Sequence, residues 1–373
     1  MRTENFLLEK YMGIYEFSAP YLLCTSDCET ITVSELLSFE EGAEAGLMDL
    51  RLGYTEARGG KEFREEISKL YGNISPDDVI TFAGAEEGIF IFMNAVLSKG
   101  DHVIVQFPAY QSLYEIAEAI GCEVTLWEMK EEDGWRPDPD FLVKNIRENT
   151  KAIIINSPHN PTGFNLPKED FGTIVNAARE NDLYLFSDEV YRQLEFDPET
   201  RLPAAADLYE KGFSLGVISK AFGLAGLRSG WIATRNRETL EKISSLKDYT
   251  TICSSAPSEY LAAVALRYSD RLVDRSLGII RKNLEILDSF MERHSDLFEW
   301  VRPVAASIGF VRLKTGESAT DFCKKVVDET GVLLLPSTVY EFGDSHFRVG
   351  FGREDMEQCL EKFEIFLGLV EIL

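Results

Sequence analysis

Short apolar runs alternate with amphipathic segments through the first two thirds of the chain. Ala152–Asn156 (AIIIN) and Leu183–Ser187 (LYLFS) are continuous apolar runs, the pattern of strands buried on both faces of a parallel sheet. Lys168–Glu180, between them, has the spacing of a helix that connects parallel strands. Further strands are predicted at Asp78–Phe82, His102–Gln106, Glu123–Trp127, Ser214–Ser219 and Trp231–Thr234, and further helices at Gly60–Tyr71, Ala85–Leu97 and Ser112–Ile120. This alternation predicts a doubly wound α/β domain with a mostly parallel sheet of about seven strands flanked by helices.

After about Ala265 the order of the elements changes. A long helical pattern reaches about Phe298. It is followed by strands at Gly309–Leu313, Gly331–Leu335 and His346–Phe351 and by helices at Thr320–Glu329 and Arg353–Leu367. We therefore expect a large ligand-binding domain over residues 46–265 and a smaller α+β domain made of residues 1–45 and 266–373.

Composition and charge narrow the possible partners. The 373 residues are 45% hydrophobic and 27% charged, which is typical of a globular protein. Lys and Arg number 38 against 63 Asp and Glu, so the formal charge is 38 − 63 = −25. Nucleic acid and anionic membranes are therefore disfavoured as partners. Any anionic ligand needs locally placed cations and backbone dipoles.

Cysteines and histidines show no metal-ligand spacing. Six cysteines are scattered, and the only close pair, Cys24 and Cys28, has no second pair nearby to complete a zinc site. Reduced thiols and no metal are expected, and the N-terminus carries no long apolar segment. These features predict a soluble, cytoplasmic protein.

Two segments join a predicted strand end to unusual polar residues. Asn156–Gly163 (NSPHNPTG) holds two prolines, two asparagines and a glycine, so it is predicted to be an ordered turn, although a simple strand–helix connection would need nothing more. Asp188 and Tyr191 follow the strand LYLFS, at the carboxyl end where α/β sheets place ligands. Asp188 taken alone is equally consistent with a helix cap.

Two further segments have the chemistry of an anion site and a reactive amine. Ala83–Gly88 (AGAEEG) is a strand-to-helix turn whose backbone N–H groups are suited to a phosphate. In Ser219–Gly230, Lys220 ends an apolar strand and Arg228 follows in a Gly-rich loop. Desolvation at such a position lowers the pKa of an amine and suits it to Schiff-base chemistry, whereas a lone lysine is usually a solvated surface charge.

In this order and spacing, the four segments resemble the pyridoxal 5'-phosphate (PLP)-dependent aminotransferases of class I/II, fold type I. The resemblance covers nearly the whole chain. It implies that Lys220 forms the Schiff base with PLP and then transfers the Cα proton. It implies that Asp188 pairs with the pyridine nitrogen, and that Asn160 and Tyr191 donate hydrogen bonds to the 3'-oxygen of the ring.

The resemblance also assigns the residues around the ring, the phosphate and the substrate. Tyr110 corresponds to the aromatic residue stacked on the ring. The phosphate ligands are implied to be Arg228, Ser219, the amides of Ala85 and Glu86, and Tyr54 contributed by the other subunit of a homodimer. Arg348, in HFRVGF, corresponds to the arginine that binds the substrate α-carboxylate bidentately, with Asn160 beside it.

The chain departs from the family pattern at a few positions. Val217 stands three residues before the lysine, where a small or hydroxyl residue usually faces the phosphate, so Ser219 is the expected substitute donor. Ser229 replaces a usual apolar residue. Glu86 and Glu87 are expected to complement the helix dipole and face away from the ligand. No arginine occurs in Asp248–Pro257, which disfavours a dedicated dicarboxylate amino donor.

The leading functional hypothesis is an aminotransferase acting between an amino acid and a 2-oxo acid. A PLP-dependent lyase or cyclase, catalysing β/γ-elimination or replacement, is the alternative, because such enzymes share these residues. A catalytically silent regulator on this fold is a third possibility, opposed by the presence of Lys220. The substrate side chain is not readable, and Tyr15, Phe17 and Tyr21 are expected to pack between domains rather than line a pocket.

Overall fold

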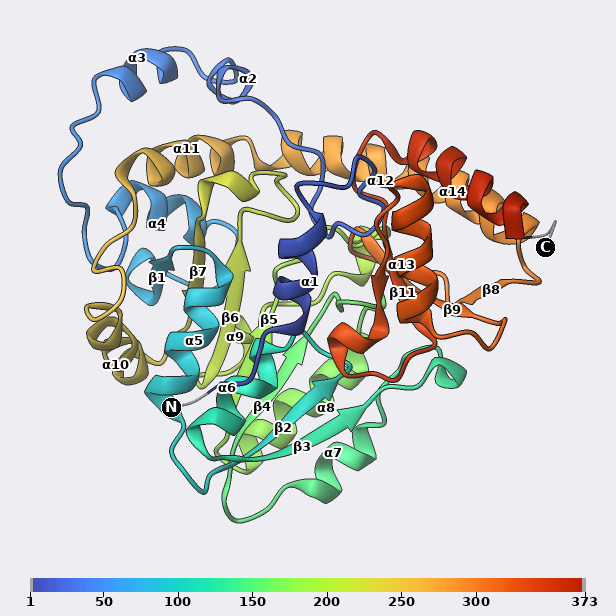
Figure 1. The fold of residues 1–373 in the computed structure, drawn as a ribbon. Helices are drawn as coiled ribbons and strands as arrows, with labels where there is room; N and C mark the ends of the chain where they lie inside the picture. The colour runs from blue at the N-terminus through green and yellow to red at the C-terminus, as the bar shows by residue number, and fades with distance from the viewer. Residues whose placement is uncertain (1–2, 371–373) are drawn as a thin grey trace.

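A seven-stranded sheet forms the centre of the molecule in the computed structural model, which describes residues 3–370 (Figure 1). The strand order is β1-β7-β6-β5-β4-β2-β3. The strands are β1 (Val79–Phe82), β2 (His102–Phe107), β3 (Glu123–Glu128), β4 (Thr150–Asn156), β5 (Tyr184–Asp188), β6 (Gly212–Val217) and β7 (Gly230–Ala233). Strands β2 to β6 run parallel, while β7 is antiparallel to both β6 and β1. The prediction of a mostly parallel sheet of about seven strands is confirmed.

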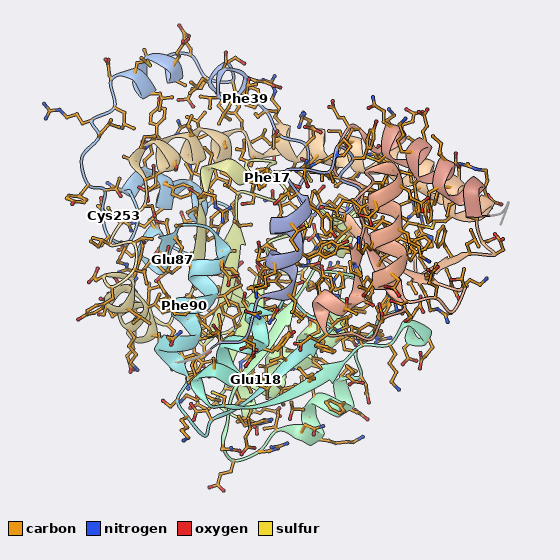
Figure 2. All side chains as sticks on the ribbon, in the orientation of Figure 1. Phe17, Phe39, Glu87, Phe90, Glu118 and Cys253 are labelled. Atoms are coloured by element: carbon orange, nitrogen blue, oxygen red, sulfur yellow. The ribbon has the colours of Figure 1, made fainter. Side chains whose placement is uncertain are left out.

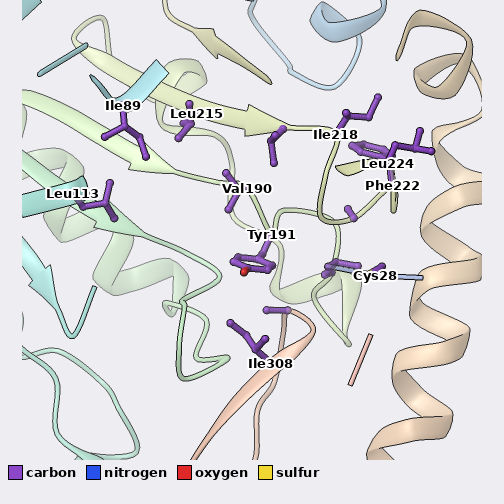
Figure 3. Close-up of a cluster of buried hydrophobic side chains, with 14 of the residues drawn as sticks. Cys28, Ile89, Leu113, Val190, Tyr191, Leu215, Ile218, Phe222, Leu224 and Ile308 are labelled. Carbon is purple, nitrogen blue, oxygen red and sulfur yellow. The ribbon is translucent and has the colours of Figure 1, made fainter. Parts of the chain in front are cut away.

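Helices cover both faces of this sheet, which explains the continuous apolar runs. On β4, Ile154 packs into the core on one face, while Ile153 and Ile155 pack into a separate core on the other. The helices of this part of the chain are α4 (Lys61–Ser68), α5 (Ala85–Val96), α6 (Ser112–Ile120), α7 (Pro139–Asn145), α8 (Lys168–Glu180), α9 (Ala205–Leu208), α10 (Arg237–Lys247) and α11 (Ala256–Arg267). Figure 3 shows part of the larger core, with Val190 next to Tyr191 and with Ile218 near Phe222 and Leu224.

A second sheet lies beside the first. Its order is β10-β11-β9-β8, and every pairing is antiparallel. Its strands are β8 (Phe298–Trp300), β9 (Ile308–Leu313), β10 (Leu335–Pro336) and β11 (His346–Gly350). The helices packed with it are α12 (Ser269–Arg293), α13 (Ala319–Thr330), α14 (Met356–Val370) and α1 (Leu7–Tyr15). The expected smaller α+β unit is therefore present, while its division from the rest at residues 45 and 266 stays a prediction.

The segment between α1 and α4 forms an arm along α11 (Figure 1). It contains α2 (Val33–Leu37) and α3 (Ala43–Met48). The Tyr260 hydroxyl donates to the Ala43 carbonyl at 2.8 Å, and Arg267 pairs with Glu40 at 2.7 Å, so the arm is fastened to α11. Short 3-10 turns complete the chain at η1 (Pro76–Asp78), η2 (Glu131–Asp133), η3 (Pro198–Thr200), η4 (Ala225–Leu227) and η5 (Ser337–Tyr340).

Three expectations were wrong in detail. The long helical pattern after about Ala265 corresponds to the single helix α12, which ends at Arg293 rather than near Phe298, where strand β8 begins. Of the predicted strand Gly331–Leu335, only Leu335 belongs to β10, because the Val332 backbone bridges to Tyr21 instead. Phe17 does not pack between domains, since its side chain is 95% exposed (Figure 2). Within residues 3–370, none of the helices has the length and apolar character needed to cross a membrane.

Candidate active site

The carboxyl ends of β4 and β5 place the first two predicted segments side by side. Asn156 and Asp188 are register partners in the parallel sheet. The Asn156 side chain donates to the Asp188 carbonyl at 2.9 Å and accepts from the Asn160 backbone N–H at 2.7 Å. The turn NSPHNPTG is therefore tied to the end of the neighbouring strand, which fixes Asn160 above the sheet.

Asp188 is a buried carboxylate with few partners. It is 5% exposed and accepts one hydrogen bond, from the Val190 N–H at 3.1 Å. Burial raises its pKa to about 7, against the opposing effects of that hydrogen bond and the charge of Lys220. A carboxylate in this state is stabilised by any cation placed beside it.

Lys220 extends from the loop after β6 into the same space. Its Nζ donates to the Ser26 hydroxyl at 2.8 Å and lies 5.6 Å from the ring centroid of Tyr191. Burial lowers the pKa of the amine, opposed by the nearby charge of Asp27 and, to a smaller extent, Asp188. The desolvation predicted from the sequence is present, and a lowered pKa favours the neutral, nucleophilic amine.

The start of α5 forms a cradle for an anion. The helix has no side-chain cap, and its N-cap Gly84 has φ = 89°. A Cβ atom on Gly84 would lie 2.7 Å from a terminal nitrogen of Arg228, and one on Gly230 would lie 2.9 Å from the Ala85 nitrogen. Glycine at both positions lets the arginine and the first N–H groups of the helix approach the same point.

Arg348, on β11, is held in a buried cluster. It is 3% exposed, and its Nε and Nη2 donate to the Cys24 carbonyl at 3.0 and 2.8 Å. Its Nη1 donates to the Tyr340 hydroxyl at 2.6 Å and to Asn160 Oδ1 at 3.2 Å. Tyr340 also donates to Asn160 Oδ1, at 2.9 Å, which leaves the Asn160 amide nitrogen as a free donor within the described residues. The small sheet thereby brings its arginine to the turn of the large sheet.

Tyr110, Ser219 and Glu86 complete the surroundings. The Tyr110 hydroxyl donates to Glu9 at 3.0 Å, and the Ser219 hydroxyl has no hydrogen-bond partner among residues 3–370. Glu87 accepts from Thr250 in the loop after α10, but it also accepts from the Ala83 backbone N–H at 2.6 Å, so its carboxylate lies against the anion turn and does not simply face away from it. Glu86 differs from expectation: it is half-buried, accepts from the Ser112 hydroxyl at 2.6 Å, and its charge raises the pKa values of Tyr110 and Asp188.

Tyr54 is the one predicted site residue that the single chain leaves outside this cluster. Its side chain is 92% exposed, on the part of the arm between α3 and α4. The neighbouring Thr55 hydroxyl donates to the Ser254 carbonyl at 3.0 Å, which places the loop against the segment between α10 and α11.

Sequence analysis missed Ser26, Tyr340 and the carbonyl of Cys24. All three contact Lys220 or Arg348, yet they lie in segments without a recognisable pattern. A backbone carbonyl leaves no trace in residue identity. Tyr340 lies eight positions before Arg348 in the sequence, and a spacing of eight residues does not indicate that two side chains are in contact.

Comparison with known proteins gives consistent results. The family model described as "Aminotransferase class I and II" matches residues 22–363. An aspartate/prephenate aminotransferase of Thermus thermophilus is 28% identical over 341 residues, covering 88% of this chain and 87% of that protein. The crystal structure of a PLP-dependent aminotransferase from Streptococcus suis superimposes with a TM-score of 0.93 at 33% identity, over 98% of both chains. A PLP-dependent cyclase, OrfR, solved in complex with Au, gives a TM-score of 0.90 at 27% identity, again over 98% of both chains.

Proposed function

Because the chain belongs to the aminotransferase class I and II family, we propose that it transfers an amino group between an amino acid and a 2-oxo acid. The observation that carries the proposal is the pair of Lys220 and Asp188, a half-buried amine of lowered pKa near a buried carboxylate of raised pKa. Arg348 lies at the same site as the binding group for a substrate carboxylate.

The residues present fit PLP, the cofactor of the family. The ring nitrogen needs an anion, and Asp188 is a buried carboxylate that lacks a dedicated cation. The phosphate needs cations and N–H donors, and the cradle beside Gly84 and Gly230 has both. When bound, the cofactor supplies an aldehyde that condenses with primary amines and a ring that accepts the electrons of the substrate Cα–H bond.

We assign the remaining roles as follows. Asp188 pairs with the ring nitrogen, Asn160 and Tyr191 donate to the 3'-oxygen, and Tyr110 stacks on the ring. The proposed phosphate ligands are Arg228, Ser219, the amides of Ala85 and Glu86, and Tyr54 of the partner subunit.

The catalytic work of the chain is positioning and proton transfer. Arg348 and Asn160 hold the substrate α-carboxylate, and their orientation is fixed by Tyr340 and the Cys24 carbonyl. Lys220, whose pKa is lowered by burial, accepts the Cα proton and returns it to a different atom. Ser26 supports the amine as a hydrogen-bond acceptor in the resting state.

We also propose a homodimer in which Tyr54 reaches the partner's site. Several large apolar side chains near the Tyr54 loop are exposed, which is unusual for a monomer. They are Met48 (79%), Leu52 (82%), Tyr249 (89%) and Ile252 (54%). A cytoplasmic location is proposed from the six free cysteines, which disulfide-forming compartments disfavour.

The test is a single half-reaction. Purified, PLP-loaded protein is mixed with individual amino acids in the absence of any oxo acid, and cofactor absorbance and products are followed. We expect conversion of the cofactor to its amine form with one equivalent of 2-oxo acid per site. Loss of the starting absorbance without oxo-acid formation would overturn the aminotransferase assignment.

A second candidate is supported by the likeness to OrfR, a PLP-dependent cyclase at a TM-score of 0.90. A cyclase or lyase would use the same lysine, aspartate and arginine, but would release a cyclised or eliminated product and return the cofactor to its starting form. Catalytic turnover of an amino acid without an oxo-acid acceptor therefore favours this candidate.

A further inference from the structure

His159 is a fully buried histidine in the turn NSPHNPTG, directly before Asn160. Its Nε2 lies 2.8 Å from the Pro108 carbonyl oxygen, and its Nδ1 lies 2.8 Å from the Thr162 hydroxyl. Because a carbonyl oxygen can only accept, Nε2 must carry the ring hydrogen. The ring therefore links two segments, its own turn and the loop after β2.

The state of the ring follows from its surroundings. Burial lowers the pKa of His159 to about 3, opposed by the bond to Pro108, so the imidazole is neutral near neutral pH. A neutral ring with its hydrogen on Nε2 has a bare Nδ1, which must accept from the Thr162 hydroxyl. Thr162 Oγ1 in turn accepts from the Phe164 N–H at 3.2 Å. Both ring nitrogens are thus occupied, and His159 is a fixed link rather than an acid or a base.

The loop after β2 is held by this link. Pro108 has no N–H, and neither Pro108 nor Ala109 makes another hydrogen bond within residues 3–370. Backbone bonding resumes at the Tyr110 carbonyl, which accepts from the Leu113 N–H at 2.9 Å. The bond from His159 therefore anchors the backbone immediately before Tyr110.

The turn on the other side of His159 is firmly anchored. The Asn160 N–H donates to Asn156 Oδ1 at 2.7 Å, at the end of β4. The Asn160 side-chain oxygen accepts from Tyr340 and Arg348. Strands β2 and β4 are neighbours in the large sheet, so their carboxyl ends lie side by side. The turn can therefore serve as the fixed point from which His159 holds the neighbouring loop.

We propose that His159 is a positioning residue, which sets the separation between Tyr110 and Asn160 through its bond to the Pro108 carbonyl. The inference rests on the proposed function, in which Tyr110 stacks on the cofactor ring and Asn160 donates to its 3'-oxygen. An aromatic face and an amide donor bind a planar ring best when both are held in place before the ring arrives. Loss of the link should therefore loosen Tyr110 while every group that touches the ring is still present.

Two substitutions cut the two bonds of His159 separately. A glutamine amide nitrogen lies as many bonds from Cβ as Nε2 does, so His159→Gln keeps a donor for Pro108 and loses the bond to Thr162. An asparagine oxygen lies as many bonds from Cβ as Nδ1 does, so His159→Asn keeps an acceptor for Thr162 and loses the bond to Pro108. The pair distinguishes the link to the loop from the bracing of the turn itself.

The measurements are the PLP dissociation constant, from cofactor titration, and the visible circular dichroism per bound cofactor, which reports how firmly the ring is oriented. We expect His159→Asn to weaken PLP binding about tenfold and to reduce the dichroism, because a buried carbonyl loses its donor. His159→Gln should stay close to wild type in both measurements. The reverse order, equal losses in both variants, or wild-type values in both would overturn the proposal.

His102→Asn is the control for loss of a buried histidine bond. His102 is also fully buried, and its ring nitrogens lie 2.8 Å from the hydroxyls of Thr150 and Thr125. It is the first residue of β2, at the opposite end of the strand from Pro108. The variant should lower the free energy of unfolding and leave both cofactor measurements unchanged. Losses equal to those of His159→Asn would contradict the proposal.

A further variant keeps the test decisive if His159→Asn does not fold. Thr162→Val removes the hydroxyl that bonds the ring and leaves the bond to Pro108 in place. It should lower stability and keep the wild-type dichroism per bound cofactor, and a reduced dichroism in Thr162→Val or His159→Gln would overturn the proposal. If the wild-type protein binds no PLP, the proposed function fails; if it binds PLP and the variants rank differently, only the positioning role fails.

Discussion

At the scale of single residues, the site is defined by how burial changes acids and bases. Asp188 and Lys220 each sit where water is scarce, and the pKa of each moves toward the neutral form. Burial of these two groups lowers the stability of the cofactor-free protein, whereas in the PLP-loaded protein both groups interact with the cofactor. The first two predictions follow from this environment and from Arg348.

The first prediction concerns the pH dependence of stability. A carboxyl whose pKa is about 7 when folded and about 3.9 when unfolded binds its proton more tightly in the folded state. Stability of the cofactor-free protein is therefore lost as pH rises from about 4 through 7. Asp188→Asn removes this loss, so the variant should gain about 2–3 kcal/mol relative to wild type between pH 5 and pH 8. Denaturant unfolding measures the difference.

The loaded protein is the control for this prediction. With PLP bound, the wild type should be the more stable protein at pH 8, because the asparagine has no charge to offer the ring nitrogen. An identical pH response of the two cofactor-free proteins would contradict the burial argument.

The second prediction concerns Arg348. Its guanidinium combines two bonds to the Cys24 carbonyl with bonds to Tyr340 and Asn160, a fork that an ammonium cannot reproduce. Arg348→Lys should lower kcat/KM by about 100-fold, mainly through KM, with little change in cofactor affinity. Steady-state kinetics and cofactor titration test both parts, and unchanged kinetics would place the carboxylate site elsewhere.

At the scale of helices and strands, the cradle depends on the close approach of β7 to the start of α5. Gly230 is the contact point, because a Cβ atom there would lie 2.8 Å from the Gly84 carbonyl carbon. The requirement is steric and independent of charge. It predicts different effects of substitution at Gly230, the first residue of β7, and at Gly226, four residues earlier in η4.

The third prediction uses that contrast. Gly230→Ala should weaken PLP binding at least tenfold and destabilise the fold by about 1–3 kcal/mol, because backbone atoms must move. Gly226→Ala is the matched control, since its added Cβ atom would meet nothing within 4 Å. Equal cofactor dissociation constants for the two variants would show that the cradle does not depend on this approach.

Sequence patterns located most of these elements because their signals are local. The apolar runs of β4 and β5, with a helical pattern between them, predict a crossover connection between parallel strands. The helix predicted at Lys168–Glu180 has the same bounds as α8. α11 was not among the predicted helices; Pro257 falls in its first turn, where proline is tolerated. Strand β10 was overestimated because Val332 bonds to the N-terminal segment, a tertiary contact that no window of sequence contains.

The site divides in the same way. Lys220, Asp188 and Asn160 lie at strand ends or turns, where sequence patterns indicate ligand sites. Arg348 lies within β11 and was predicted from the family resemblance. The structure brings all four residues together. Ser26 and Tyr340 reach them from separate segments, and their partners are decided by folding alone. The roles assigned to these residues stay predictions until the variants are measured.

At the scale of the complete molecule, the exposed loop around Tyr54 is the feature that a single chain does not bring to the candidate site. A side chain that is 92% exposed yet expected to bind a phosphate needs a second copy of the chain. Complementation between two defective chains tests this directly.

The fourth prediction is recovery of activity on mixing. Lys220→Ala and Tyr54→Ala homodimers should be inactive and strongly impaired, respectively. After unfolding and refolding together in equal amounts, half of the dimers are mixed and each mixed dimer has one intact site, so about a quarter of wild-type activity should return. If Tyr54 serves its own chain, no intact site forms and activity stays at the level of the separate variants.

The anchor of Arg348 is an oxygen of the main chain, and this has a consequence for how such proteins diverge. A substitution at position 24 that fits the buried space of the Cys24 side chain leaves the carbonyl in place, so this contact constrains the path of the backbone and not the functional group of the side chain. A search of related sequences for invariant residues would therefore not detect this contact, although every related protein with the same backbone path would retain it.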